Sequence, residues 1–255
     1  MTDDLPSLAI KDAVATIQLN RPSLHNRIEP EDLTELNGLL SAVQANPALR
    51  VLVLTATGRS FSSGFNIGKL KGRDAGESGG DSFEHTADRM ERFLLPTICA
   101  LNGGVYGGST DLALACDFRI GVDGMTLFMP AAQLGLHYYA GGMRRYVSRL
   151  GLNAAKRLFL TAARADTAEL LRIGYLDEAV PPERLMPRVA ELAAMLTANA
   201  PIAVQGMKRA LNDIARGETD LVLIAANQAR SRQSADMVEG QAAWLEKRTP
   251  RFTGV

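Results

Sequence analysis

The apolar positions of this chain predict β-strands that alternate with helices along much of its length. Apolar runs with the length of strands lie at residues 8–11, 13–19, 51–55, 97–101, 118–122 and 126–128. Between two of these runs, residues 30–45 repeat apolar side chains at helical spacing, and Asn46-Pro47 ends that pattern. The alternation is typical of an α/β architecture, although periodicity alone leaves a doubly wound sheet open.

After about Pro181 the pattern becomes helical only. It predicts helices at residues 183–198, 202–216, 221–234 and 236–247. Their apolar faces, which include Leu221, Ile224 and Ala225, exceed what one short tail can bury on itself, so they require a partner. We therefore divide the chain into a core at residues 1–190 and a helical region at residues 191–255.

Two of the predicted strands end in glycine-rich segments that lead into helical patterns. The first segment has the sequence FSSGFNI (residues 61–67), and the second has the sequence NGGVYGGSTD (residues 102–111). Backbone N–H groups at a helix start have no partner within the helix and can bind negative charge. If the two segments converge, they form an oxyanion hole. This arrangement indicates chemistry in which negative charge develops on a carbonyl oxygen.

The composition limits the possible function classes. The chain has 255 residues, of which 46% are apolar and 22% are charged, as expected for a globular protein. Its formal net charge is zero, which gives no support for a nucleic-acid or anionic-membrane partner. Cys99 and Cys116 lie in apolar stretches and are expected to be buried thiols, and no residue spacing suggests a metal site. The acidic start without a long apolar run favours a cytoplasmic location.

The two glycine-rich segments resemble those of the crotonase family, also called the enoyl-CoA hydratase/isomerase family. The segments IQLNRPSLHNRI, GMRRYVSRLG, AAKRLFLTAARADTAELLRIGYLDEAV and EGQAAWLEKR resemble further parts of that family, in the same order, from about Leu8 to about Lys247. The resemblance implies an α/β spiral of β-β-α units with a C-terminal helical trimerisation region. It also implies a homotrimer or hexamer and an acyl-CoA thioester substrate, with coenzyme A as part of the substrate and no separate cofactor.

The resemblance assigns candidate catalytic groups to the two segments. The backbone N–H groups of Phe65 and Gly108 match the two donors of the oxyanion hole. Asp111 matches the position of a catalytic glutamate. It could instead be a first-turn acid that the helix dipole stabilises. We expect a general acid or base, because an acid inside the apolar LALAC helix is costly to bury without a role.

One departure from the family pattern concerns the second catalytic glutamate of its hydratases. Ala131 occupies that position, and Gln133 nearby can form hydrogen bonds but does not titrate. Hydration needs both carboxylates around one water, so we expect double-bond isomerisation rather than standard hydration. Tyr138 matches a tyrosine of family members that decarboxylate acyl-CoA substrates, although it could instead only shape the acyl pocket. For His137 we expect the role in shaping the pocket.

Coenzyme A contacts also follow from the resemblance. They carry over to Asn26, Arg27, Ile28, Ser63, Asn66, Ile67 and Lys247, the last from a neighbouring subunit. Lys69 could contact the nucleotide from its own subunit, although both lysines could equally be solvated surface charges. Residues 69–85 have four glycines, many charges and no clear period, which predicts either a flexible surface loop or a mobile wall of the acyl pocket.

The function expected from the sequence is therefore an acyl-CoA enzyme that stabilises a thioester enolate. An acyl-CoA decarboxylase or a thioester hydrolase that uses Tyr138 remains an alternative. A protein that binds acyl-CoA without catalysis is a further alternative from a different class.

Overall fold

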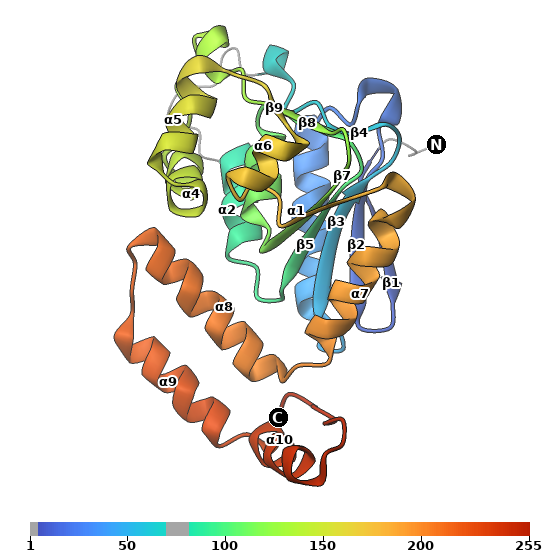
Figure 1. Cartoon of the computed structure of the whole chain (residues 1–255), viewed down its shortest axis with the longest axis vertical. Helices are drawn as coiled ribbons and strands as arrows, with labels where there is room; N and C mark the ends of the chain where they lie inside the picture. Colours follow the sequence, from blue (N-terminus) through green and yellow to red (C-terminus); the bar gives the residue numbers. More distant parts are fainter. Residues whose placement is uncertain (1–4, 70–81) are drawn as a thin grey trace.

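The computed structural model, which describes residues 5–69 and 82–255, is a spiral of β-β-α units followed by an arm of helices (Figure 1). The expected α/β spiral is confirmed. The main sheet has the strand order β1 (Ser7–Lys11), β2 (Val14–Leu19), β3 (Val51–Ala56), β5 (Thr97–Leu101), β7 (Phe118–Val122) and β10 (Glu178–Val180). Strands β1 and β2 are antiparallel, and the remaining neighbours are parallel. Every residue of β3 and β5 is buried, as expected for parallel strands covered on both faces.

A smaller sheet brings the functional loops together. Its strand order is β4 (Ser60–Ser62), β6 (Gly104–Tyr106), β8 (Thr126–Phe128) and β9 (Ala165–Asp166). Strands β3, β5 and β7 of the main sheet are each followed along the chain by one strand of the smaller sheet. Because β4 and β6 are parallel neighbours, the segments that follow them leave the sheet side by side.

Helices cover the two sheets. In the core these are α1 (Pro30–Ala45), α2 (Phe83–Glu91), α3 (Ser109–Ala115), α4 (Ala140–Leu150), α5 (Leu152–Thr161), α6 (Thr167–Arg172) and α7 (Leu185–Thr197). Single 3-10 turns lie at η1 (Pro22–Leu24), η2 (Ile67–Lys69), η3 (Ala131–Leu134) and η4 (Pro182–Arg184). The observed α1 has the bounds that its periodicity predicts, and a capping box between Glu29 and Asp32 fixes its start.

The segment after the first glycine-rich motif differs in part from the expectation of an irregular loop. Residues 70–81 of that segment lie outside the described residues. Helix α2 begins at Phe83, because the Ser82 hydroxyl accepts a hydrogen bond from the backbone N–H of His85 at 3.1 Å. His85 is therefore a helical residue rather than part of a loop.

The C-terminal arm consists of α8 (Pro201–Arg216), α9 (Leu221–Arg232) and α10 (Ala235–Glu246), and it extends away from the sheets (Figure 1). Large apolar side chains of the arm are exposed to solvent, with 81% exposure at Val222 and 84% at Trp244. Residue 190 lies within α7, which contacts the strands of the main sheet, so the projecting helices start at Pro201. No helix in the described part of the chain has the length and apolar character needed to span a membrane.

Candidate functional site

A cavity of about 890 Å³ lies where the two glycine-rich segments meet. It is lined by both segments, by the start of α2, by η3 and by the residues that precede α4. Phe65, Gly108, Ala131 and Tyr138, which the sequence singled out, all line this cavity. The structure thus brings together residues from four separate parts of the chain.

The contact between the two segments depends on glycine. Gly64 has a φ of +92°, which L-residues with a side chain rarely adopt. A Cβ atom at this position would lie 2.8 Å from the carbonyl oxygen of Tyr106 and 3.4 Å from the backbone nitrogen of Gly108. A buried hydrogen bond of 2.7 Å between the hydroxyls of Ser62 and Ser109 also joins the segments. Any side chain at position 64 would therefore push the two loops apart.

Phe65 and Gly108 line the cavity, and their backbone N–H groups have no hydrogen-bond partner in the described part of the protein. The next N–H groups along each loop, of Asn66 and Gly107, donate to main-chain carbonyl oxygens at 2.9 Å. The N–H groups beside these two are thus used within the protein, whereas those of Phe65 and Gly108 remain available to a ligand. Two fixed donors at one wall of a cavity are the elements of an oxyanion hole.

Asp111 lies on α3, fully buried, and is not among the described residues that line the cavity. The Nε and Nη2 atoms of Arg145 donate to its two carboxylate oxygens at 3.0 and 2.8 Å. This bidentate pair supplies the counter-charge that a buried carboxylate needs. The sequence predicts a general acid or base at Asp111, and in the structure its carboxylate lies behind the cavity wall, where Arg145 donates to both of its oxygens.

Two tyrosines connect Asp111 to the cavity. The hydroxyl of Tyr139 donates to Oδ2 of Asp111 at 2.5 Å, and the hydroxyl of Tyr138 donates to that of Tyr139 at 3.2 Å. Their rings stack with centroids 4.3 Å apart, and both line the cavity. Burial, reinforced by the Asp111 carboxylate, raises the pKa of both phenols well above the ordinary value. Both tyrosines therefore remain neutral near pH 7.

The cavity has few other titratable groups among the described residues that line it. Ala131 lines it at 4% exposure, so a carboxylate at this position would face the cavity. Glu84, in the first turn of α2, is the one carboxylate among the described lining residues. His137 also lines the cavity, and its Nδ1 atom donates to the carbonyl oxygen of Tyr138 at 2.8 Å. The paired carboxylates that hydration requires are not assembled by these residues.

Of the residues expected to contact coenzyme A, two have their polar side chains occupied by the protein. The Asn26 amide is buried, donates to two carbonyl oxygens at 2.8 and 2.9 Å, and accepts an N–H at 2.8 Å. The Asn66 amide donates to the carboxylate of Glu29 at 2.8 and 3.0 Å. Ile28 is buried and pairs with Phe65 in a parallel bridge. Asn26, Ile28 and Asn66 therefore hold the glycine-rich segment at residues 61–67 in place.

The remaining residues expected to contact coenzyme A are more accessible. Ser63 and Ile67 line the cavity. Arg27 is partly exposed and pairs with Glu29 at 2.6 Å. Lys69 ends η2, and Lys247 follows α10 on the arm with a φ of +54°; neither is among the described residues that line the cavity.

Sequence reasoning did not identify Glu84, Tyr139, Arg145 or Arg164, which contribute to this site or to its support. One signal is present in the sequence. A buried acid within an apolar helix requires a buried cation, and the three arginines of GMRRYVSRLG are candidates in a helix with small residues at its start. Which arginine faces Asp111 follows only from the packing of α4 on α3.

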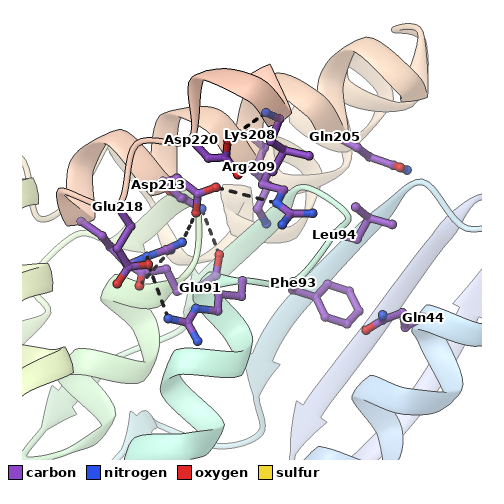
Figure 2. Close-up of a pocket in the computed structure, with 14 residues that line it drawn as sticks. Gln44, Glu91, Phe93, Leu94, Gln205, Lys208, Arg209, Asp213, Glu218 and Asp220 are labelled. Carbon is purple, nitrogen blue, oxygen red and sulfur yellow. Dashed lines mark hydrogen bonds and ion pairs between the residues drawn. The ribbon is translucent and has the colours of Figure 1, made fainter. Parts of the chain in front are cut away.

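Arg145 also belongs to a charge network that leads away from the cavity. Its Nη1 atom contacts Glu91 at 3.0 Å, and Glu91 lies 3.6 Å from Arg216 of α8. Glu91 lines a second cavity, of about 570 Å³, between α2 and the first two helices of the arm. Figure 2 shows its charged side chains facing one another, and several of them form ion pairs. Because these charges are paired, we place the candidate active site in the larger cavity.

Comparisons with known proteins agree with the architecture. The family model described as enoyl-CoA hydratase/isomerase matches residues 9–255. A putative enoyl-CoA hydratase/isomerase of Bacillus subtilis is 34% identical, with 100% of both chains covered, and a crotonyl-CoA hydratase of Syntrophomonas wolfei is 31% identical, with 95% of both chains covered. A crystal structure of an enoyl-CoA hydratase subunit from Geobacillus kaustophilus matches with a TM-score of 0.89 at 30% identity, covering 98% of both chains.

Proposed function

Because this chain belongs to the enoyl-CoA hydratase/isomerase family, we propose that it shifts a double bond in an acyl-CoA thioester by way of an enolate. The observation that carries the proposal is the pair of unused N–H groups, of Phe65 and Gly108, at one wall of the cavity. Such donors stabilise an enolate oxygen more strongly than the neutral thioester carbonyl, and so they lower the barrier to its formation.

The absence of a second carboxylate on the η3 wall favours isomerisation over hydration. Adding water requires a group that activates the water and a second group that delivers a proton to carbon. Ala131 supplies neither function. Isomerisation requires only that one proton leaves the α-carbon and that one returns to the γ-carbon, which a single acid/base group accomplishes.

We assign the proton transfer to Asp111 acting through the two tyrosines. The α-carbon proton passes to the Tyr138 oxygen as the Tyr138 proton moves to Tyr139 and the Tyr139 proton moves to Oδ2 of Asp111. The electron pair of the C–H bond becomes the enolate. Reversal of the same shifts delivers a proton to the γ-carbon. Because both phenols have a raised pKa, the shifts are concerted and no tyrosinate accumulates. Arg145 is a positioning residue that holds the carboxylate.

The test is the conversion of a 3-enoyl-CoA to the conjugated trans-2-enoyl-CoA, followed by the absorbance of the conjugated thioester. We expect conversion without subsequent loss of that absorbance to hydration. Rapid hydration of the 2-enoyl product would contradict the proposal. Carbon dioxide release from a carboxylated acyl-CoA would favour the decarboxylase, release of free coenzyme A would favour the hydrolase, and tight binding without change would favour a non-catalytic binder.

Coenzyme A binding and assembly complete the proposal. We propose that Ser63, Ile67 and Arg27 contact coenzyme A within one subunit, with Lys69 beside them and Lys247 contributed by a neighbouring subunit. The exposed apolar residues of the arm support a homotrimer or a hexamer built from trimers. Light scattering at micromolar concentration tests this assembly, and a stable monomer would contradict it. A cytoplasmic location remains a prediction.

A further inference from the structure

Arg164, between α5 and β9, is an exposed cation at the wall of the candidate active site, and it has no ion-pair partner in the part of the chain that the structure describes. Its guanidinium carbon lies 4.5 Å from the centre of the Phe128 ring, and both residues line the 890 Å³ cavity. Among the described residues, no hydrogen bond or ion pair to Arg164 is formed. The aromatic ring fixes the face of the guanidinium and leaves its N–H edge available to a ligand.

Among the described residues, the other charged or titratable groups of this cavity form no ion pair or hydrogen bond with Arg164. Glu84 lines the same cavity but forms no ion pair with Arg164. His137 is engaged through Nδ1 with a backbone carbonyl. Much of the remaining wall is apolar, with Phe65, Phe128 and Met129 among its residues. Arg164 is exposed, so water solvates its charge in the free protein, and a ligand anion that reaches it would form a charge-assisted hydrogen bond beside an apolar wall.

The position of Arg164 relative to the oxyanion hole indicates which part of a thioester it meets. The carbonyl oxygen of Phe128 accepts a hydrogen bond from the Gly107 N–H at 2.9 Å. Phe128, whose ring contacts Arg164, is therefore hydrogen-bonded to the glycine-rich segment that contains Gly108. The pantetheine arm separates the thioester from the phosphates of coenzyme A by its full length. A cation next to the hole is therefore better placed for an anion on the acyl side.

We propose that Arg164 recognises a carboxylate on the acyl group, so that the substrate class is a dicarboxylic acyl-CoA. This inference rests on the proposed function for its substrate class, but binding alone tests it. A carboxylate and a guanidinium match in a bidentate geometry, which selects for a fixed chain length between the thioester and the acid. A guanidinium binds phosphate in the same way as it binds a carboxylate. The phosphates of coenzyme A are therefore the competing anions for Arg164.

The test measures the affinities of succinyl-, glutaryl- and adipyl-CoA by calorimetry, each against the unbranched monocarboxylic thioester of equal length. The wild-type protein should bind one of the three diacid thioesters more tightly than the monocarboxylic thioester of equal length. In Arg164→Met that preference should fall on the order of 10- to 100-fold, the usual value of a charge-assisted hydrogen bond. Arg164→Lys should restore part of it. Lys156→Met, which removes a cation from the outer face of α5, is the matched control and should bind like the wild type.

Each remaining outcome overturns the inference. Arg164→Met could weaken the binding of diacid and monoacid thioesters equally, and leave unchanged the binding of thioesters without the nucleotide part of coenzyme A. That result would assign Arg164 to the phosphates. Unchanged binding of all thioesters would remove any role in recognition. Because these probes are saturated and calorimetry needs no turnover, failure of the isomerase assay leaves the result for Arg164 intact.

Discussion

The substitution Asp111→Asn separates a catalytic role of this carboxylate from a purely structural one. It keeps the shape of the side chain and removes the charge that receives two donors from Arg145 and one from Tyr139. We expect turnover of a 3-enoyl-CoA to fall by at least about 100-fold, the scale of losing a general acid or base. Affinity for saturated acyl-CoA should remain near that of the wild type, because Asp111 does not line the cavity.

The structure also gives the expected cost in stability. Breaking a buried ion pair costs about 3–5 kcal/mol when the remaining charge has no other partner. Arg145 keeps Asp88 at 2.9 Å and Glu91 at 3.0 Å, so the free energy of unfolding should fall by only about 1–3 kcal/mol. Urea denaturation measures this loss. The protein should remain folded at 25 °C, so the loss of turnover cannot be attributed to unfolding.

The matched control is Asp88→Asn. It removes another carboxylate from the same arginine, but Asp88 is 28% exposed and forms no hydrogen bond with Tyr138 or Tyr139. We expect a loss of about 1 kcal/mol or less, with nearly normal turnover. If Asp111→Asn also keeps normal turnover, or if both variants lose activity equally, then Asp111 only supports the packing of α3 and α4. That result would refute the assignment of proton transfer to Asp111.

Three further predictions follow from the same geometry. Ala131→Glu should create partial hydration of a short trans-2-enoyl-CoA, seen as loss of its conjugated absorbance; no hydration in a variant that binds coenzyme A would mean that one added carboxylate is insufficient. Gly64→Ala should destabilise the protein by about 1–2 kcal/mol from its left-handed backbone alone and should reduce turnover as the loops separate; normal values of both would show that the loops tolerate the 2.8 Å approach. The raised pKa of Tyr138 and Tyr139 should prevent their ionisation near pH 10, the ordinary phenol pKa, so turnover should not fall at that pH for this reason. A tyrosinate absorbance change near pH 10 in the wild type that Tyr139→Phe lacks would contradict this.

The sequence predicts the parts of the fold that have a long period or a clear composition. Helix α1 and strands β5, β7 and β8 have the predicted bounds, and the helices of the arm begin or end within two residues of theirs. The sequence does not predict strands β4, β6 and β9: each has only two or three residues and includes serine, glycine or aspartate, unlike the equally short β8. Helix α2 was not predicted, because it follows a glycine-rich stretch and its apolar face is short.

The candidate site divides in the same way. The positions of Phe65 and Gly108 follow from local sequence, because each depends on one strand, one turn and one helix start. The surroundings of Asp111 depend on Arg145, a residue 34 positions away on another helix. Adjacent tyrosines at 138 and 139 look equivalent in the sequence, and only the packing of α4 on α3 determines that Tyr139 faces the carboxylate.

The central claim is that the protein forms an enolate of an acyl-CoA thioester. The most direct measurement is the exchange of α-carbon protons of a 3-enoyl-CoA in deuterium oxide, followed by proton NMR. The account predicts deuterium incorporation at the α-carbon by the wild-type protein, at a rate lowered by at least about 100-fold in Asp111→Asn. Absence of exchange in the wild-type protein, with the thioester shown to be bound, would contradict the account.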